Sequence, residues 1–194
     1  MKKLDGSNKL RTAIFISGNG SNLKNLIKFS LLKKSPIKIE LIICNNLKAK
    51  GLRYSEKYKI KKKIFFFKRK ITDENIILKY LKKNNIQLIC LAGFMKILSK
   101  NFIKNFKGKI LNIHPSLLPK YKGLNTHERV IENNEKFSGC TVHYVNASLD
   151  SGKIILQKRV RVRKNDTPKS LAKKILKQEH LIYPRSLLKL FANL

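Results

Sequence analysis

The order of apolar and polar positions along the chain predicts a regular alternation of strands and helices. Apolar runs typical of buried strands fall at residues 12–17, 37–44, 64–67, 87–92 and 109–114. Segments with helical spacing of apolar residues lie between them, at residues 21–31, at 47–58 and from Thr72 onward. After Asn125 the pattern predicts a short helix, two consecutive strands near 141–145 and 154–162, and a long helix from about Pro168.

This alternation predicts an α/β fold, with a mainly parallel sheet covered by helices on both faces. The last two strands follow one another without a helix, which favours an antiparallel edge. A chain of 194 residues suits a single domain and can close a core without disulfides or a structural metal. We expect residues 1–194 to form one domain, with residues 1–11 as a flexible N-terminal extension.

The amino-acid composition limits the classes of protein to which the chain could belong. The chain has 44 basic and 11 acidic residues and a formal charge of +33, but 36 of the basic residues are lysines spread over the whole sequence. Together with abundant Ile and Asn, this favours a general compositional bias over a selected polyanion-binding surface, although the second reading stays open. The polar start and the absence of an apolar run of about 18 residues predict a cytoplasmic protein without a membrane span. Cys44, Cys90 and Cys140 are expected to be buried thiols.

The first candidate site is the loop Ser17–Asn22, which joins the first predicted strand to the first helix. Gly18 and Gly20 allow a ligand to approach the backbone, and the following helix would offer free N–H groups to a phosphate. Leu23 occupies the position of the third glycine in a dinucleotide-binding loop, so a single phosphate is favoured. A simple tight turn is the alternative.

The second group of candidates consists of polar residues at predicted strand and loop ends. Asn112 and His114 are two residues apart at the end of a strand, so both side chains point to one side, where they could stabilise an oxyanion and move a proton. Asp150 could orient His114, or it could simply form a turn. Glu179 lies on the apolar stripe of the last helix, where it could receive a substrate amine or form a border salt bridge.

Five segments together resemble the phosphoribosylglycinamide formyltransferase family: residues 16–23, 91–99, 111–123, 142–152 and 178–184. The resemblance implies a seven-stranded Rossmann-like domain. It also implies an enzyme that moves the formyl group of 10-formyltetrahydrofolate, its cosubstrate, to the amine of glycinamide ribonucleotide in purine synthesis, without a metal. The matching residues have three implied roles. The implied catalytic residues are Asn112, His114 and Asp150. Those implied to bind the ribonucleotide are Gly20, Ser21, Asn22 and Glu179. Those implied to bind the folate are Lys70 (or Arg69), Met95, Lys96, Ile97, Leu98 and Asn112.

Three other functions remain open at this point. A formyltetrahydrofolate deformylase resembles the same catalytic region, but it usually carries an extra N-terminal domain. A methionyl-tRNA formyltransferase shares part of the 111–123 segment, but it normally has a C-terminal domain and lacks the glycine loop. A basic nucleic-acid-binding protein would explain the charge but not the polar trio. The expected partners are therefore small-molecule substrates, with no membrane and no specific nucleic acid, for a monomer or weak dimer.

Overall fold

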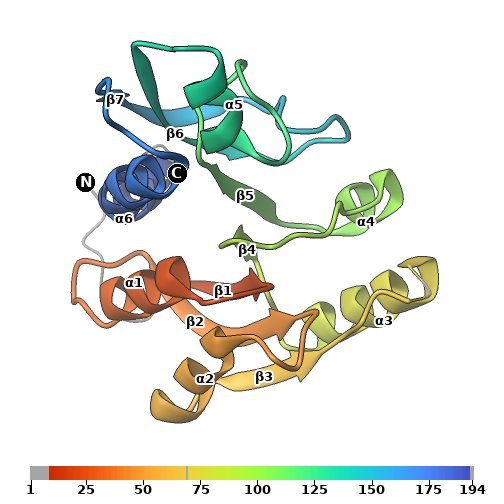
Figure 1. The fold of residues 1–194 in the computed structure, drawn as a ribbon. Coiled ribbons are helices and arrows are strands. Elements are labelled where there is room, and N and C mark those ends of the chain that lie inside the picture. Colours follow the sequence, from red (N-terminus) through yellow and green to blue (C-terminus); the bar gives the residue numbers. More distant parts are fainter. Residues whose placement is uncertain (1–8, 69, 193–194) are drawn as a thin grey trace. The chain divides into compact units, whose positions relative to one another are not determined.

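The computed structural model describes residues 9–68 and 70–192 and has the predicted α/β architecture (Figure 1). Its elements are β1 (Leu10–Ile16), α1 (Ser21–Ser30), β2 (Ile37–Cys44), the 3-10 helix η1 (Lys50–Leu52), α2 (Arg53–Lys57), β3 (Lys61–Ile64), α3 (Lys70–Lys83), β4 (Leu88–Leu91), α4 (Lys100–Asn105), β5 (Lys109–His114), α5 (Thr126–Glu132), β6 (Phe137–Tyr144), β7 (Ile154–Arg161) and α6 (Pro168–Ala192). The seven strands follow the order β3-β2-β1-β4-β5-β6-β7. Contacts divide the chain into two compact units, one ending at Leu111 and the other beginning at Asn112.

The first unit is built on parallel strands. β1 pairs with β2 on one side and β4 on the other, and β2 also pairs with β3. β4 is apolar along its whole length, and β1 and β2 are apolar and buried over residues 13–16 and 41–44, as expected where both faces of a parallel sheet are covered. The fully buried Phe15 makes edge-to-face contacts with Phe94 and Phe102, which joins β1 to α4.

The third strand lies three residues earlier than its apolar run predicts. Residues 64–67 were expected to form it, but β3 is the lysine-rich segment Lys61–Ile64. Phe65 and Phe67 instead follow the strand as buried side chains, and Phe67 has a positive φ of 56°. β3 is an edge strand with exposed lysines, a composition that discourages pairing with other chains. Burial of the phenylalanines thus reflects packing of a loop rather than strand pairing.

Two boundaries in the first unit also differ from expectation. β1 begins at Leu10, two residues inside the predicted N-terminal extension. α3 begins at Lys70 rather than at Thr72, and its buried face includes the carboxylate of Glu74. Glu74 accepts hydrogen bonds from the N–H and the hydroxyl of Ser99. Ser99 in turn caps the short helix α4, which the sequence pattern did not predict.

The second unit contains the antiparallel pair β6–β7 and the long helix α6 that packs against both strands (Figure 1). The predicted antiparallel edge is confirmed. α6 continues through Pro184, and Leu171, Ile175 and Tyr183 are fully buried on its inner face. This helix therefore supplies most of the apolar cover of the β6–β7 pair.

The three cysteines are free and buried, as the sequence predicted. Burial, assisted by the nearby charge of Glu179, raises the pKa of Cys140 to about 12. Within residues 9–68 and 70–192, no helix is long and apolar enough to cross a membrane. The same residues contain no cluster of three or more metal-ligating side chains.

A buried carboxylate ahead of α6 generates a stability prediction. Asp166 accepts hydrogen bonds from the Arg163 N–H, from Ser170 and from Lys174 at 2.8, 2.7 and 2.6 Å. Burial alone would raise the pKa of Asp166, but these donors outweigh burial and lower the pKa from 3.8 to about 2. Because the native carboxylate binds protons more weakly than the unfolded one, its contribution is present above about pH 4 and disappears as the pH falls towards 2.

We therefore expect Asp166→Asn to lower the free energy of unfolding by about 1–2 kcal/mol at neutral pH, since Lys174 is partly exposed and screened. The difference between the two proteins should shrink as the pH falls below about 4. Urea unfolding at several pH values measures both quantities. A difference that stays constant with pH would show that the charge of Asp166 contributes nothing.

Candidate active site

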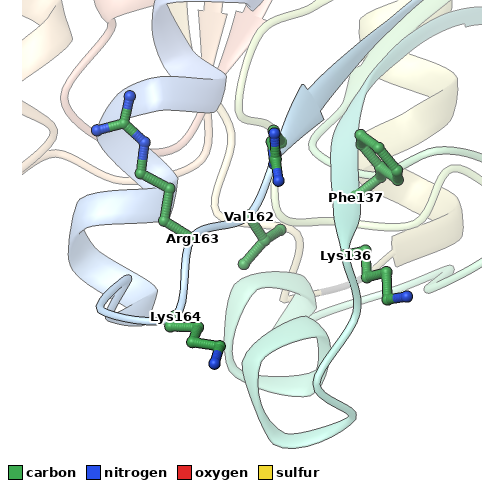
Figure 2. Close-up of a pocket in the computed structure, with 6 residues that line it drawn as sticks. Lys136, Phe137, Val162, Arg163 and Lys164 are labelled. Atoms are coloured by element: carbon green, nitrogen blue, oxygen red, sulfur yellow. The ribbon is translucent and has the colours of Figure 1, made fainter.

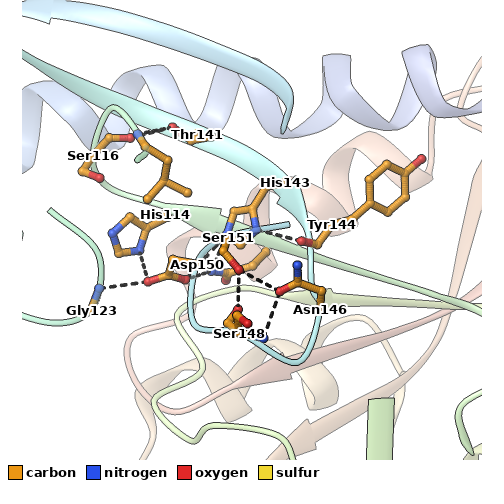
Figure 3. Close-up of polar contacts among 12 residues, drawn as sticks. His114, Ser116, Gly123, Thr141, His143, Tyr144, Asn146, Ser148, Asp150 and Ser151 are labelled. Atoms are coloured by element: carbon orange, nitrogen blue, oxygen red, sulfur yellow. Dashed lines mark hydrogen bonds and ion pairs between the residues drawn. The ribbon is translucent and has the colours of Figure 1, made fainter. Parts of the chain in front are cut away.

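The carboxylate of Asp150 is the centre of a polar cluster in the second unit (Figure 3). Its Oδ2 atom accepts a hydrogen bond from the Gly123 N–H at 2.9 Å and lies 3.4 Å from Nδ1 of His114. Its Oδ1 atom accepts from the amide of Asn112 at 3.5 Å. The side chain is only 9% exposed, and the residue has a positive φ of 44°. Such a backbone conformation is uncommon outside glycine and is found at functional sites.

His114 has an acceptor at each ring nitrogen. Nε2 donates to the Tyr121 carbonyl at 2.8 Å, and Nδ1 faces the Asp150 carboxylate. A carbonyl can only accept, so Nε2 carries a proton, while Nδ1 lies 3.4 Å from a carboxylate oxygen of Asp150. Both ring nitrogens thus face an oxygen atom that can accept a hydrogen bond. The predicted trio of Asn112, His114 and Asp150 is brought together in the structure.

The cluster also contains His143, which the sequence interpretation did not single out. Its ring lies on β6, 2% exposed, with Nδ1 2.9 Å from the Tyr144 carbonyl and Nε2 3.3 Å from the amide nitrogen of Asn112. Nδ1 therefore donates, and Nε2 accepts from Asn112. Burial is the main cause that lowers the pKa of His143, so the ring is neutral in this tautomer.

A sequence signal for His143 did exist. In the predicted strand at 141–145 a histidine stands among apolar residues, two positions from a buried Thr141 on the same face. A buried histidine of this kind needs hydrogen-bond partners, which makes it a candidate member of a polar cluster. The sequence could not show which partners it has, because they come from β5 and from the 146–152 loop.

In the first unit, the glycine loop leads directly into α1. Gly20 is the residue before the helix and has a φ of 72°. An added Cβ at Gly20 would lie 2.6 Å from the Cα of Gly51, so the two backbones touch here. No side chain among the described residues caps α1, and its first turn holds no acidic residue. The N–H groups of Ser21 and Asn22 at this positive helix end suit an anion.

The other predicted binding residues lie in three places. The backbone N–H of Met95 donates to the hydroxyl of Ser17 at 2.7 Å, which attaches the 94–98 segment to the end of β1. Met95, Lys96 and Ile97 are exposed, whereas Leu98 is buried. Lys70 is exposed at the start of α3, and Arg69 lies outside the described residues. Glu179 is buried on α6, within electrostatic reach of Cys140 on β6.

A family model described as formyl transferase matches residues 10–187. The chain belongs to the formyl transferase family. Phosphoribosylglycinamide formyltransferase of Haemophilus influenzae is 41% identical over 177 residues, which cover 90% of this chain and 84% of that protein. The human trifunctional purine biosynthetic protein adenosine-3 is 40% identical over 92% of the chain, but the match spans only 18% of the human protein.

Solved structures that are similar to this chain belong to the same family. The chain is similar to phosphoribosylglycinamide formyltransferase from Anaplasma phagocytophilum, with 44% identity, a TM-score of 0.86 and coverage of 95% and 88% of the two chains. The corresponding protein from Brucella melitensis has 41% identity, a TM-score of 0.88 and coverage of 94% and 95%. The seven-stranded, mostly parallel fold expected from the resemblance is thereby confirmed.

The geometry of this formyl transferase predicts how His143 titrates. We expect its midpoint below 6.5, with the proton of the neutral ring on Nδ1, because burial disfavours the charge and Tyr144 accepts from Nδ1. Nitrogen–proton correlation NMR on labelled protein reports both the midpoint and the tautomer. The chain has four histidines, so single His→Gln variants assign the signals. A midpoint above 6.5, or a proton on Nε2, would contradict the proposed hydrogen bond from Asn112.

Proposed function

We propose that this formyl transferase moves the formyl group of 10-formyltetrahydrofolate to the amine of glycinamide ribonucleotide. The observation that carries the proposal is the partly buried cluster of Asn112, His114 and Asp150 in a chain that shares 41% identity with a phosphoribosylglycinamide formyltransferase. The trio supplies an amide donor, an imidazolium donor and a carboxylate, the groups that transfer of an acyl group between nitrogens requires. A cytoplasmic location and a monomer or weak dimer belong to the same proposal.

The reaction divides into two steps at one carbon atom. The substrate amine attacks the formyl carbon, which turns the carbonyl oxygen into an oxyanion, and the amine loses a proton. Collapse of the intermediate then breaks the bond to the folate nitrogen, which takes up a proton. In our proposal, Asn112 and protonated His114 donate to the oxyanion, and Asp150 keeps the imidazolium charged and oriented.

The donors that this mechanism uses have acceptors within the protein. His114 donates to the Tyr121 carbonyl through Nε2, and Asn112 donates to His143 and Asp150. An oxyanion competes well with the two neutral acceptors, the Tyr121 carbonyl and the His143 ring, because charge-assisted hydrogen bonds are about twice as strong. Tyr121 has a positive φ of 56° and follows two prolines in the loop after β5. Exchange of the Tyr121 carbonyl for the oxyanion is therefore part of the proposed binding step.

The remaining roles follow the resemblance and the local geometry. Gly20, Ser21 and Asn22 are proposed to bind the phosphate of the ribonucleotide, supported by the uncapped start of α1. Glu179 is proposed to receive the glycinamide end of the same substrate. Folate binding is assigned to Lys70, the exposed segment Met95–Ile97, Leu98 and Asn112.

Hydrolysis of the formyl group is the alternative reaction at the same trio. It differs only in the nucleophile, which would be water instead of the substrate amine. The related proteins of known structure support transfer, because their names specify the glycinamide substrate. A deformylase needs no phosphate site, so the glycine loop of the first unit also favours transfer.

The deciding assay mixes both substrates with purified protein and separates formylated product from free formate. We expect product only when both substrates are present, and a loss of about 10²–10³ in kcat for His114→Ala because a donor to the oxyanion is removed. His127→Gln changes a histidine of α5 and serves as the control. Formate released without ribonucleotide would overturn the proposal in favour of hydrolysis, and full activity of a folded His114→Ala variant would remove His114 from the mechanism.

A second prediction tests the phosphate loop. Gly20→Ala should raise KM for the ribonucleotide about 10- to 100-fold, because the new Cβ collides with Gly51 and displaces the N–H groups that bind phosphate. Gly18→Ala is the matched control in the same loop, since a Cβ there meets nothing within 4 Å. Steady-state kinetics give KM, and thermal unfolding checks that both variants fold. Equal KM values for the two folded variants would contradict the assignment.

A further inference from the structure

Three of the eight arginines of the chain lie close together in the sequence. Only 8 of the 44 basic residues are arginine, and three of these, Arg159, Arg161 and Arg163, occupy alternate positions within five residues. If lysine bias alone determined the basic residues, this stretch would be lysine-rich like the rest. Arginine differs from lysine in its planar fork, which binds phosphate oxygens through two parallel hydrogen bonds.

The three arginines lie on one open side of β7 and its extension. Side chains alternate along a strand, and Val160 and Val162 between the arginines are half-buried while the arginines are exposed. Pairing continues past the end of β7, because the Val162 N–H donates to the Lys136 carbonyl at 3.0 Å. Alternate residues of a strand are about 6.6 Å apart, close to the spacing of successive phosphates along a single nucleic-acid strand.

An aromatic ring accompanies the arginines. Phe137 pairs with Arg161 across the two strands and is 39% exposed. The guanidinium of Arg159, one diagonal position away, lies over the ring at 4.3 Å from its centre. Gly139, opposite Arg159, leaves no room for a side chain, because an added Cβ would lie 2.1 Å from the Lys158 carbonyl. The guanidinium of Arg159 therefore lies against an exposed aromatic ring, and aromatic rings and arginines are the side chains on which nucleobases stack.

Phe137, Arg161 and Arg163 border a hollow of about 660 Å³ (Figure 2). Its lining consists of Lys136, Phe137, Arg161, Val162, Arg163 and Lys164. Two carboxylates close to these residues in sequence have other partners, since Glu135 binds Lys120 and Tyr121, and Asp166 binds Lys174 and Ser170. Among the described residues, the ion pairs include none formed by Lys136, Arg161, Arg163 or Lys164, so these cations are available to a partner.

The hollow lies at the far end of β6 from the candidate active site. Phe137 is the first residue of β6, whereas His143 is six residues further along the strand, a separation of about 20 Å. A ligand here would not share the groups around Asp150. The site therefore calls for a function separate from formyl transfer, and it does not depend on the proposed function.

We propose that the Arg159–Arg161–Arg163 face of β7, together with Phe137, binds single-stranded RNA. The arginines contact successive phosphates, and the Phe137–Arg159 stack holds a base. A lipid surface fits less well, because Arg159 lies over the ring of Phe137, which is the one large apolar side chain among the residues that line the hollow. The net charge of +33 attracts any polyanion. The proposed face adds binding affinity to this general electrostatic attraction.

The test compares charge-matched variants in binding a fluorescein-labelled uridine oligomer of about 12 nucleotides, measured by anisotropy from about 50 to 200 mM KCl. R159Q/R161Q/R163Q removes three charges from the face, and K33Q/K34Q/K48Q removes three exposed lysine charges elsewhere. We expect the arginine variant to lose at least about tenfold in affinity and its salt slope to fall by about 2, corresponding to three lost phosphate contacts. The lysine variant should lose much less.

Two further variants separate the fork and the stack from the charge. R159K/R161K/R163K keeps the charge and should still weaken binding severalfold, because lysine lacks the bidentate fork. Phe137→Leu should weaken binding about fivefold or more through the lost stacking. Melting curves and formyl-transfer activity, which should be unchanged, confirm that each variant is folded.

Three results would overturn the proposal. Equal losses for the arginine and lysine variants would assign RNA binding to the overall charge. Unchanged binding by the arginine-to-lysine variant would remove the role of the fork. Arginine-dependent binding to phosphatidylserine-containing vesicles, with RNA binding insensitive to the same arginines, would make the face a membrane contact.

Discussion

The geometry of the catalytic cluster depends on one buried negative charge, the carboxylate of Asp150. It holds the 120–125 loop through the Gly123 N–H, faces the ring of His114, and receives the amide of Asn112. A carboxylate with so little exposure is stable only when its oxygens have partners, and two of the partners, Asn112 and His114, are groups that the proposed chemistry needs in a fixed place. The contacts that stabilise the buried carboxylate of Asp150 therefore also orient the cluster.

This constraint on buried carboxylates is stricter in this chain than in an ordinary protein, because acidic residues are scarce. The chain has 11 acidic and 44 basic residues, and several of the acidic residues that the structure describes have a specific structural partner. Glu40 pairs with Arg11 and Lys38, Glu74 binds Ser99 ahead of α4, and Asp166 ties the start of α6 to Lys174. Surface lysines can be exchanged or added at small cost, because exposed pairs contribute little. Buried carboxylates cannot, since each satisfies donors that would otherwise be left without an acceptor.

The sequence predicts most where a pattern is local and least where a partner comes from elsewhere. β2 and β5 match their predicted bounds because long apolar runs with clear ends define them. β3 was misplaced, since its pairing with β2 outweighs the apolar preference of Phe65 and Phe67. α4 has only six residues, too few to show a period, and depends on the cap at Ser99. His143 was missed for a similar reason. Its place in the cluster depends on contacts with Asn112 and Asp150, which are 31 and 7 residues away along the chain.

The candidate sites of the two units share a property that explains how they withstand a strongly biased composition. The glycine loop is defined by contact between the backbones of Gly20 and Gly51, and the trio is defined by a positive φ at Asp150 and by hydrogen bonds that only particular side chains make. Substitution of surface positions by lysine, isoleucine or asparagine leaves both untouched. Composition can thus change nearly the whole exterior, while function is restricted to a few positions where backbone geometry or a buried charge allows one kind of residue. By the same reasoning, three arginines at alternate positions of β7 and its extension, in a lysine-rich chain, fit the proposal that the shape of the cation matters there, and not only its charge.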